Sequence, residues 1–399
     1  MPPGRCWPTG SAPTRPAACS CELWIRTLVQ QGISAFEDLN GSGHERVAYA
    51  PLSVAGGTRM SAARAYLHRA TRRPNLRLEL HCEVRRIIFD GTTATGVEVM
   101  TPDGEARFTA RREVIVCAGT MESPLLLERS GVGDPDVLAA GGVPMVAANP
   151  AVGENLRQHR GAVFALRLRG VPGRNRELVT PAARLRTTAR YLLRRSGALA
   201  HGGTTVLAVL RSSPAVAGPD MEVLFTPVSV SGHDGTSAGA DAGDGVTVGF
   251  YPHAPTSTGS IHLTGPSAHH PPRLVPGYLS TGHDRDLTVA AFRRVRQILE
   301  ADPFASAASE TAPGPQVSDD DSVLRYVLEH GFAGNHQVGT CALGPEGAVD
   351  DDLRVRGTQR LRVADASVMP TLTTGNTVAP SMAIGWIAGD LIRHGKAVA

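Results

Sequence analysis

The chain has almost no lysine and few aromatic side chains. Lys396 is the only lysine among 40 basic residues, and Phe, Trp and Tyr together make up 5% of the 399 residues. Arginines are interleaved with acidic residues, so the formal net charge is only +3. Proteins that bind nucleic acid gather positive charge in a patch or stripe. The composition therefore argues against nucleic acid as a partner.

Long apolar runs, paired cysteines and metal-binding motifs are also missing. No apolar run reaches the length of about 20 residues that a membrane-spanning helix needs. Residues 1–22 hold arginines and prolines but no apolar stretch of the kind found in secretory signals. The six cysteines form no Cys-x-x-Cys pair, and no His-Glu-x-x-His occurs. We therefore expect a cytoplasmic protein without a transmembrane segment, a disulfide framework or a metal site.

The clearest local pattern is a strand followed by a turn and a helix. Val114–Ala118 is a continuous apolar run, which predicts a buried parallel strand. Ser123 and Pro124 predict the start of a helix, and Gly131 predicts its left-handed end. Elements in this order form a crevice in which a flat cofactor can contact backbone amides. The pattern favours an α/β fold, and 399 residues suffice for two domains.

Other segments have weaker but usable patterns. Residues 1–31 show neither helical nor strand periodicity, and residues 231–245 are a low-complexity segment for which we expect a loop. Predicted helices lie over residues 61–71, from Thr180-Pro181 to Gly197 with its leucines on the apolar side, and from Thr377 to Gly395. Predicted strands lie over Leu76–Leu80, Val84–Phe89, Thr95–Met100 and Ala106–Thr109, the last two joined as a hairpin across Asp103-Gly104.

Two distant blocks carry a family resemblance. Gly119–Gly133 resembles the second signature of the glucose–methanol–choline (GMC) family of flavin-dependent alcohol oxidoreductases. Asn335–Cys341, Leu361–Pro370 and Gly375–Pro380 resemble the closing region of that family. Shorter matches are Gly57-Thr-Arg59, Arg73-Pro-Asn-Leu76, Val152-Gly-Glu-Asn-Leu156 with His159, and Gly277-Tyr-Leu-Ser280. Because the matches occur in order over roughly residues 35 to 395, they are specific as a set.

The resemblance implies a fold with two parts, one of them incomplete. A Rossmann-like FAD domain would cover residues 35–157 and return at 336–399, and a substrate domain with a mainly antiparallel sheet would cover 158–335. Residues 1–34 would be an atypical leader. The family opens with a Gly-x-Gly-x-x-Gly turn that holds the FAD pyrophosphate, and this fingerprint is absent, because Arg46 replaces the third glycine after Gly41-Ser-Gly43. We therefore expect a truncated family member that lacks the N-terminal nucleotide-binding segment.

The resemblance also implies an active site. His336, in the His-x-x-Gly-Thr element, would be the base, since an imidazole can take a hydroxyl proton at neutral pH. Asn376 would hydrogen-bond the substrate oxygen while the hydride passes to N5 of FAD. The residues expected to contact FAD are Val84, Ala118, Gly119, Asp365, Ala366, Thr377 and Val378.

Alternatives remain open at this stage. His336 could be a structural histidine bonded to backbone, and Asn376 could serve as a helix N-cap. The whole chain could be a non-catalytic GMC remnant with impaired FAD binding. As an enzyme, it would oxidise a small-molecule alcohol to an aldehyde or ketone. The electron acceptor could be oxygen, a quinone or another carrier.

Overall fold

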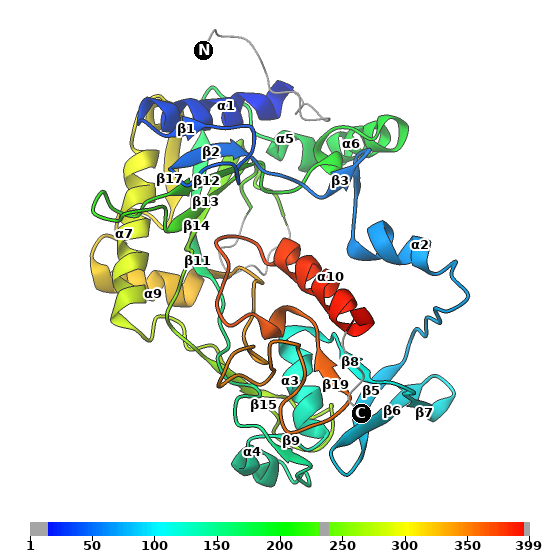
Figure 1. Cartoon of the computed structure of the whole chain (residues 1–399). Coiled ribbons are helices and arrows are strands. Elements are labelled where there is room, and N and C mark those ends of the chain that lie inside the picture. Colours follow the sequence, from blue (N-terminus) through cyan, green and yellow to red (C-terminus); the bar gives the residue numbers. More distant parts are fainter. Residues whose placement is uncertain (1–14, 231–238, 395–399) are drawn as a thin grey trace. The chain divides into compact units, whose positions relative to one another are not determined.

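The computed structural model describes residues 15–230 and 239–394, and it packs the chain as two compact units. Unit 1 consists of Met1–Arg69, Arg160–His253 and Arg285–Ala333. Unit 2 consists of Ala70–His159, Ala254–Asp284 and Gly334–Ala399. Each unit therefore joins segments that lie far apart in the sequence (Figure 1). This division reflects only how the chain packs. The boundaries between a FAD domain and a substrate domain remain a prediction from the sequence.

Unit 1 is built around an eight-stranded sheet of the described residues, with the order β1-β2-β12-β13-β14-β11-β17 and with β18 beside β11. The strands are β1 Ser34–Ala35, β2 Arg46–Tyr49, β11 Arg160–Leu168, β12 Val206–Leu210, β13 Met221–Thr226, β14 Gly245–Pro252, β17 Ala308–Ala312 and β18 Phe332–Ala333. Apart from the parallel pair β1 and β2, neighbouring strands are antiparallel. The predicted mainly antiparallel sheet is confirmed.

Helices complete the core of unit 1, and α7 and α9 lie beside the sheet in Figure 1. The helices are α1 Arg15–Gln30, α5 Asn175–Leu178, α6 Pro181–Arg194, η2 Ala198–Ala200, α7 Gly282–Leu299, α8 Phe304–Ala307 and α9 Asp320–His330. The buried ring of Phe292 from α7 lies 4.8 Å from that of Phe164 in β11. The short elements β3 Val54–Ala55, β4 Thr58–Arg59 and η1 Ala63–Leu67 also belong here, and α2 His68–Ala70 ends at the first residue of unit 2.

Helix α1 corrects the expectation that residues 1–31 have no regular structure. Cys21, Trp24 and Leu28 follow one another at helical spacing and are fully buried. The Trp24 ring stacks on Phe225 of the sheet at 5.5 Å and meets the edge of Phe304 at 5.3 Å. The expectation was wrong because this one apolar face suffices to attach the helix to the sheet.

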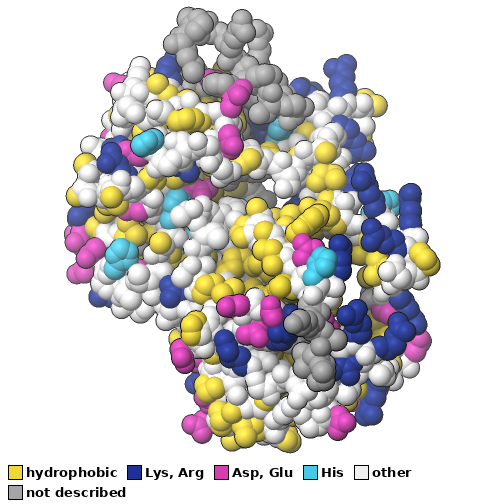
Figure 2. Space-filling model, viewed as in Figure 1, with side chains coloured by type: hydrophobic (Ala, Val, Ile, Leu, Met, Phe, Trp, Pro, Cys, Tyr) yellow, Lys and Arg dark blue, Asp and Glu magenta, His cyan; other side chains and the backbone are white. Residues whose placement is uncertain are grey.

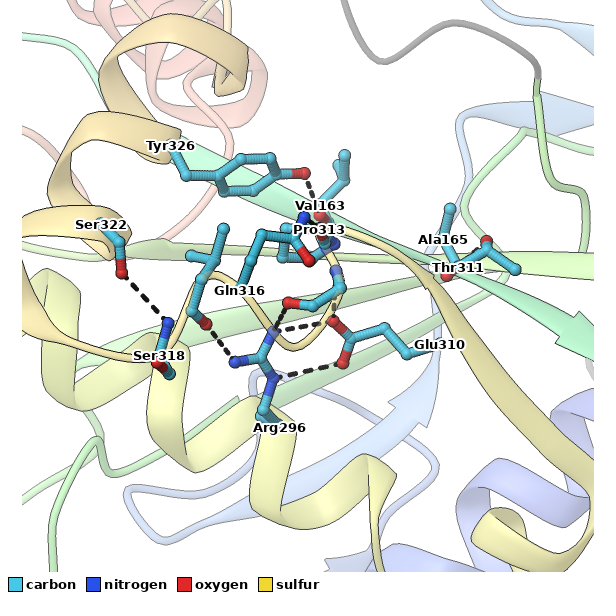
Figure 3. A network of polar contacts seen from close by, with 12 residues as sticks. Val163, Ala165, Arg296, Glu310, Thr311, Pro313, Gln316, Ser318, Ser322 and Tyr326 are labelled. Carbon is cyan, nitrogen blue, oxygen red and sulfur yellow. Dashed lines mark hydrogen bonds and ion pairs between the residues drawn. The ribbon is translucent and has the colours of Figure 1, made fainter.

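A network of polar contacts connects α7 to β17, the strand at one edge of the sheet (Figure 3). Arg296 of α7 donates to both carboxylate oxygens of Glu310 in β17, at 2.7 and 3.2 Å. The same guanidinium donates to the carbonyl oxygens of Gly314 and Val317. The hydroxyl of Tyr326 in α9 donates to the Val163 carbonyl oxygen at 2.8 Å. These bonds satisfy polar groups that the packing of α7 and α9 removes from water.

Unit 2 contains a short parallel sheet, a three-stranded antiparallel sheet and the helices beside them. Its strands are β5 Glu83–Asp90, β6 Thr93–Thr101, β7 Gly104–Thr109, β8 Val114–Val116, β9 Val132–Gly133, β10 Ala147–Ala148, β15 Ser260–His262, β16 Arg273–Val275 and β19 Leu361–Val363. Its helices are α3 Gly119–Arg129, α4 Pro135–Ala140, η3 Ala366–Val368 and α10 Val378–His394. The predicted hairpin is confirmed as β6 and β7, and β8 is parallel to β19 as predicted. The predicted burial of this strand was wrong in part, because Val116 is buried but Ile115 is 39% exposed.

Several local predictions were wrong. Helix α3 begins at Gly119, so Pro124 lies inside it and Ser123 is no N-cap. Residues 76–80 form no strand, and Leu76, Leu78 and Leu80 are 39%, 47% and 64% exposed. Helix α6 begins at its predicted cap, but its leucines at 185, 192 and 193 are exposed. The segment 231–238 of the predicted loop lies outside the described residues.

Helix α10 is apolar yet largely exposed. Val378, Trp386 and Ile387 are 56%, 72% and 55% exposed, and Ala388 is buried. Hydrophobic side chains gather on the face of the molecule where α10 lies (Figure 2). Among the described residues, no helix is both long and apolar enough to span a bilayer.

Candidate active site

The turn between β8 and α3 is held by a carboxylate from a distant part of the chain. Gly119 adopts φ +82° and donates its N–H to Oδ2 of Asp365 at 2.9 Å. The Ser123 hydroxyl donates to the same oxygen at 2.6 Å, while Oδ1 accepts from the N–H of Ser367 at 2.8 Å. Both oxygens of Asp365 therefore join the start of α3 to η3. The positive end of the α3 dipole favours a carboxylate at this position.

The segment that carries His336 is tied to the first turn of α3. The Thr120 hydroxyl donates to the carbonyl oxygen of Gln337 at 2.7 Å, and the Thr340 hydroxyl donates to the carbonyl oxygen of Thr120 at 2.6 Å. Gly339 has φ +97°, and a Cβ there would lie 2.2 Å from the carbonyl oxygen of Asn155. These contacts explain two positions of the His-x-x-Gly-Thr element. The glycine lets the loop approach the Asn155 carbonyl oxygen, and the threonine hydrogen-bonds the loop to α3.

His336 is buried against a second histidine. Its side chain is 8% exposed, His159 is fully buried, and the two Nδ1 atoms lie 3.0 Å apart. The rings meet edge to face at an angle of 85°. Gly334 donates its N–H to the His159 carbonyl oxygen at 3.0 Å, and a Cβ on it would lie 2.8 Å from Nδ1 of His336. Sequence reasoning gave His159 no role, although it ends one of the short family-like matches.

The remaining predicted site residues differ in their exposure to solvent. Asn376 is exposed in the loop before α10. Thr377 is buried, and its carbonyl oxygen accepts from the N–H of Ser381 at 3.0 Å. Val84 in β5 and Ala366 in η3 are half-buried, and Ala118 and Val378 are exposed. The convergence of His336 and Asn376 on one wall stays a prediction.

Two features of unit 2 fit the flavin end of FAD. A Cβ placed on Gly119 would meet no atom within 4 Å, so the backbone at the start of α3 is open to a flat group. The Oγ1 atom of Thr373 is buried and has no hydrogen-bond partner within the described chain, and it lies in the loop before α10. Buried polar groups are normally paired, so this hydroxyl is available to a bound cofactor.

Another buried histidine, His262 in β15, contacts the C-terminal end of α3. Its Nδ1 lies 2.7 Å from Glu128 of α3, and its Nε2 lies 2.9 Å from Glu154. Glu128 also accepts the N–H of Leu263 at 2.8 Å and is fully buried. The hydrogen bond to Glu128 raises the pKa of His262 above its ordinary value, against the opposing effect of burial. Within the described residues, no group of acidic, His or Cys side chains could hold a metal ion.

Two separate parts of the chain match models of the same protein family. Residues 12–160 and 255–385 match the N-terminal and C-terminal parts of the GMC oxidoreductase family. The first match begins at residue 12, upstream of residue 35, where the resemblance seen in the sequence begins. An uncharacterized GMC-type oxidoreductase of Mycobacterium tuberculosis is 38% identical over 346 residues, which cover 84% of this chain and 63% of that protein.

A second curated relative and two solved structures are also similar to this chain. An oxygen-dependent choline dehydrogenase of Escherichia coli is 32% identical over 389 residues, covering 94% of this chain and 68% of the relative. Pyridoxine 4-oxidase from Mesorbium loti has a TM-score of 0.79 and 28% identity, with 96% of this chain and 70% of that structure covered. A formate oxidase with 23% identity and a TM-score of 0.88, covering 97% of this chain and 72% of its own, shares the fold. The chain belongs to the GMC oxidoreductase family, a family of FAD-dependent flavoproteins.

Proposed function

We propose that this chain carries the active site for oxidation of a small-molecule alcohol to an aldehyde or ketone, with His336 as the base. The observation that carries the proposal is the burial of His336 in a loop that Thr340 holds against α3 and that Gly339 lets approach Asn155. Bound FAD would accept the hydride that the alcohol carbon loses. FAD is proposed to lie against the open backbone at Ala118 and Gly119 and the start of α10 at Thr377 and Val378.

The chemistry of His336 follows from its surroundings. Because Nδ1 is engaged with His159, Nε2 is the ring nitrogen that would take the hydroxyl proton of the substrate. Burial removes the imidazole from competing water and strengthens its electrostatic interactions with a bound alcohol. The bonds between Thr120 and both Gln337 and Thr340 fix the position of the loop, which lowers the entropic cost of orienting the base.

Asn376 is proposed to hold the substrate oxygen. An amide cannot take a proton at neutral pH, so its contribution would be a hydrogen bond from its NH₂ group. It follows Gly375, whose φ of +130° turns the chain immediately before α10. The N–H groups of the first turn of α10 carry the positive end of the helix dipole, which would stabilise negative charge on a reduced flavin. Asp365 would act indirectly, because both of its oxygens are engaged by the protein.

The decisive experiment is anaerobic flavin reduction in a stopped-flow instrument, with protein supplied with FAD. The alcohol panel includes choline, because one relative is named an oxygen-dependent choline dehydrogenase. His336→Ala should slow reduction by about 10²–10⁴-fold, the usual share of a general base. The matched control is His269→Ala, which removes an exposed histidine. If His336→Ala reduces its flavin as fast as the wild type, the base is another group.

A second candidate function is a non-catalytic one. It is favoured by the absence of the Gly-x-Gly-x-x-Gly fingerprint from the sequence, since that turn supplies the amides that bind a pyrophosphate. Titration with FAD separates the two candidates: saturable binding with alcohol-dependent bleaching supports the enzyme, and no binding at any FAD concentration supports the non-catalytic protein. Repeating the reaction with oxygen and with a quinone identifies the acceptor.

A further inference from the structure

The contact between His159 and His336 restricts where their protons lie. Each neutral imidazole carries one N–H, on either Nδ1 or Nε2. A hydrogen bond between the two Nδ1 atoms at 3.0 Å needs one donor and one acceptor, so one hydrogen occupies the gap. Two arrangements of the neutral pair satisfy this condition. In one, His336 donates from Nδ1; in the other, His159 donates.

The two arrangements give His336 opposite chemistry. If His336 donates from Nδ1, its Nε2 carries a lone pair and can accept a proton. If His159 donates instead, the single hydrogen of His336 sits on Nε2, and that nitrogen can only give a hydrogen bond. Whether neutral His336 carries its hydrogen on Nδ1 or on Nε2 therefore decides whether it is a base or a donor toward a bound alcohol.

We propose that His159 is a positioning residue that holds His336 in the Nδ1–H tautomer by accepting its hydrogen; this inference rests on the proposed role of His336 as the base. When the substrate O–H bond breaks and an Nε2–H bond forms, His336 becomes an imidazolium with hydrogens on both nitrogens. The hydrogen between the rings stays on Nδ1 of His336 throughout. His159 then stabilises the positive charge by accepting a charge-assisted hydrogen bond. In the opposite arrangement, Nε2 of His336 already carries a hydrogen, so it could take the substrate proton only after His336 had changed tautomer.

The surroundings of the pair make this a fixed arrangement. His159 is fully buried, and its carbonyl oxygen accepts the N–H of Gly334. The neighbouring Gln158 donates from its side chain to the Tyr278 hydroxyl at 2.6 Å, which anchors the same stretch of chain. The ring of His336 lies so close to Gly334 that a Cβ there would be 2.8 Å from Nδ1. Neither ring can therefore turn away without a rearrangement of the loop.

The test is ¹⁵N NMR spectroscopy of the full chain labelled at histidine, recorded at a pH where the imidazoles are neutral. Nitrogens with and without hydrogen resonate far apart, and long-range couplings to the ring protons distinguish Nδ1 from Nε2. His336→Gln identifies the His336 signals by their disappearance. We expect His336 to carry its hydrogen on Nδ1. A wild-type spectrum with the hydrogen on Nε2 overturns the proposal.

Two variants of His159 separate positioning from packing. His159→Phe keeps an aromatic ring but removes the acceptor, so His336 should lose its single tautomer. The expected fall in kcat is about 10–100-fold, the range seen when the hydrogen-bond partner of a metal-binding histidine is removed. His159→Gln supplies an amide oxygen that can accept the hydrogen, so it should restore the Nδ1–H tautomer and part of kcat. If both variants keep the wild-type tautomer, His159 only packs, and the proposal is wrong. If His159→Phe does not fold, the wild-type spectrum and His159→Gln still decide.

The outcomes also distinguish this inference from the proposed function. An Nδ1–H tautomer that depends on His159, with undiminished flavin reduction in His336→Ala, leaves the positioning role intact and refutes the base. Loss of flavin reduction in His336→Ala, with an Nε2–H tautomer in the wild type, supports a role of His336 in the reaction and refutes the positioning role of His159.

Discussion

The buried contact of Glu128 with His262 predicts a pH-dependent stability that one substitution removes. Glu128 is fully buried and His262 is 2% exposed, so the carboxylate and imidazole depend on each other for hydrogen bonds. The pKa of His262 is raised in the folded protein, chiefly by the bond to Glu128. An unfolded histidine titrates near about pH 6.5. The contribution of His262 to folding is therefore fully present below that pH and is lost as the pH rises through the higher folded pKa.

The size of the effect can be worked from the contacts. Glu128→Gln keeps acceptor capacity for the Leu263 N–H but converts charged hydrogen bonds to neutral ones, which lowers the free energy of unfolding by about 1–2 kcal/mol. Glu128→Ala leaves His262 and the Leu263 N–H without this partner, which should cost about 3–5 kcal/mol. Glu154 is the matched control, because its side chain is 55% exposed and the loss on Glu154→Gln should be about 0–1 kcal/mol.

The assay is urea unfolding followed by far-ultraviolet circular dichroism between about pH 6 and 9, the range above the unfolded pKa. The wild type and Glu154→Gln should lose stability as the pH rises, and Glu128→Gln should be less stable at pH 6 and show a flatter dependence. If Glu128→Gln keeps the wild-type slope, the charge on Glu128 does not hold the proton on His262, and the reasoning fails.

Four further predictions concern other features of the chain. Gly339→Ala should displace the His336 loop, because its Cβ would lie 2.2 Å from Asn155 O, and it should lower stability by at least about 1–3 kcal/mol in urea unfolding; unchanged stability and flavin reduction would refute this. Arg296→Met should cost about 3–5 kcal/mol, since Glu310 loses its cation in a mostly buried site, whereas Arg294→Met, on the same helix, should change little. The purified chain should contain less than one FAD per molecule by absorbance near about 450 nm, and a full complement would contradict the importance of the missing fingerprint. Asn376→His should keep partial flavin reduction, because an imidazole can also hydrogen-bond the substrate oxygen; complete loss would show that the amide is required.

Local patterns predicted those elements whose partners are also local. The hairpin of β6 and β7 follows from Asp103-Gly104 between two alternating segments, and the end of α3 follows from Gly131, which has φ +86°. In these cases the sequence within a few residues holds the physical cause.

Where residues far away in the sequence determine the local structure, the predictions from the sequence were wrong or missed the contact. Ser123 resembles a helix cap, but Asp365, 242 residues later, accepts from its hydroxyl and also from the N–H of Gly119, and the helix starts five residues earlier than predicted. Alternating leucines at 76, 78 and 80 indicate a strand, yet a strand needs a neighbour, and none in the described chain pairs with this segment. His159 could have been suspected from its place in a family-like match. Its pairing with His336 could not, because it depends on the tertiary packing of two loops 177 residues apart.

The positions of the tryptophans make the two units optically distinguishable. Trp24 is fully buried in the aromatic core of unit 1, whereas Trp386 is 72% exposed on α10 of unit 2. A buried indole emits at shorter wavelength than an exposed one, and a soluble quencher such as iodide reaches only the latter. Trp7 lies outside the described residues, and Trp7→Phe removes its emission. In that variant, the blue edge of the spectrum reports on unit 1 and the quenchable red edge on α10, so a single titration can follow both.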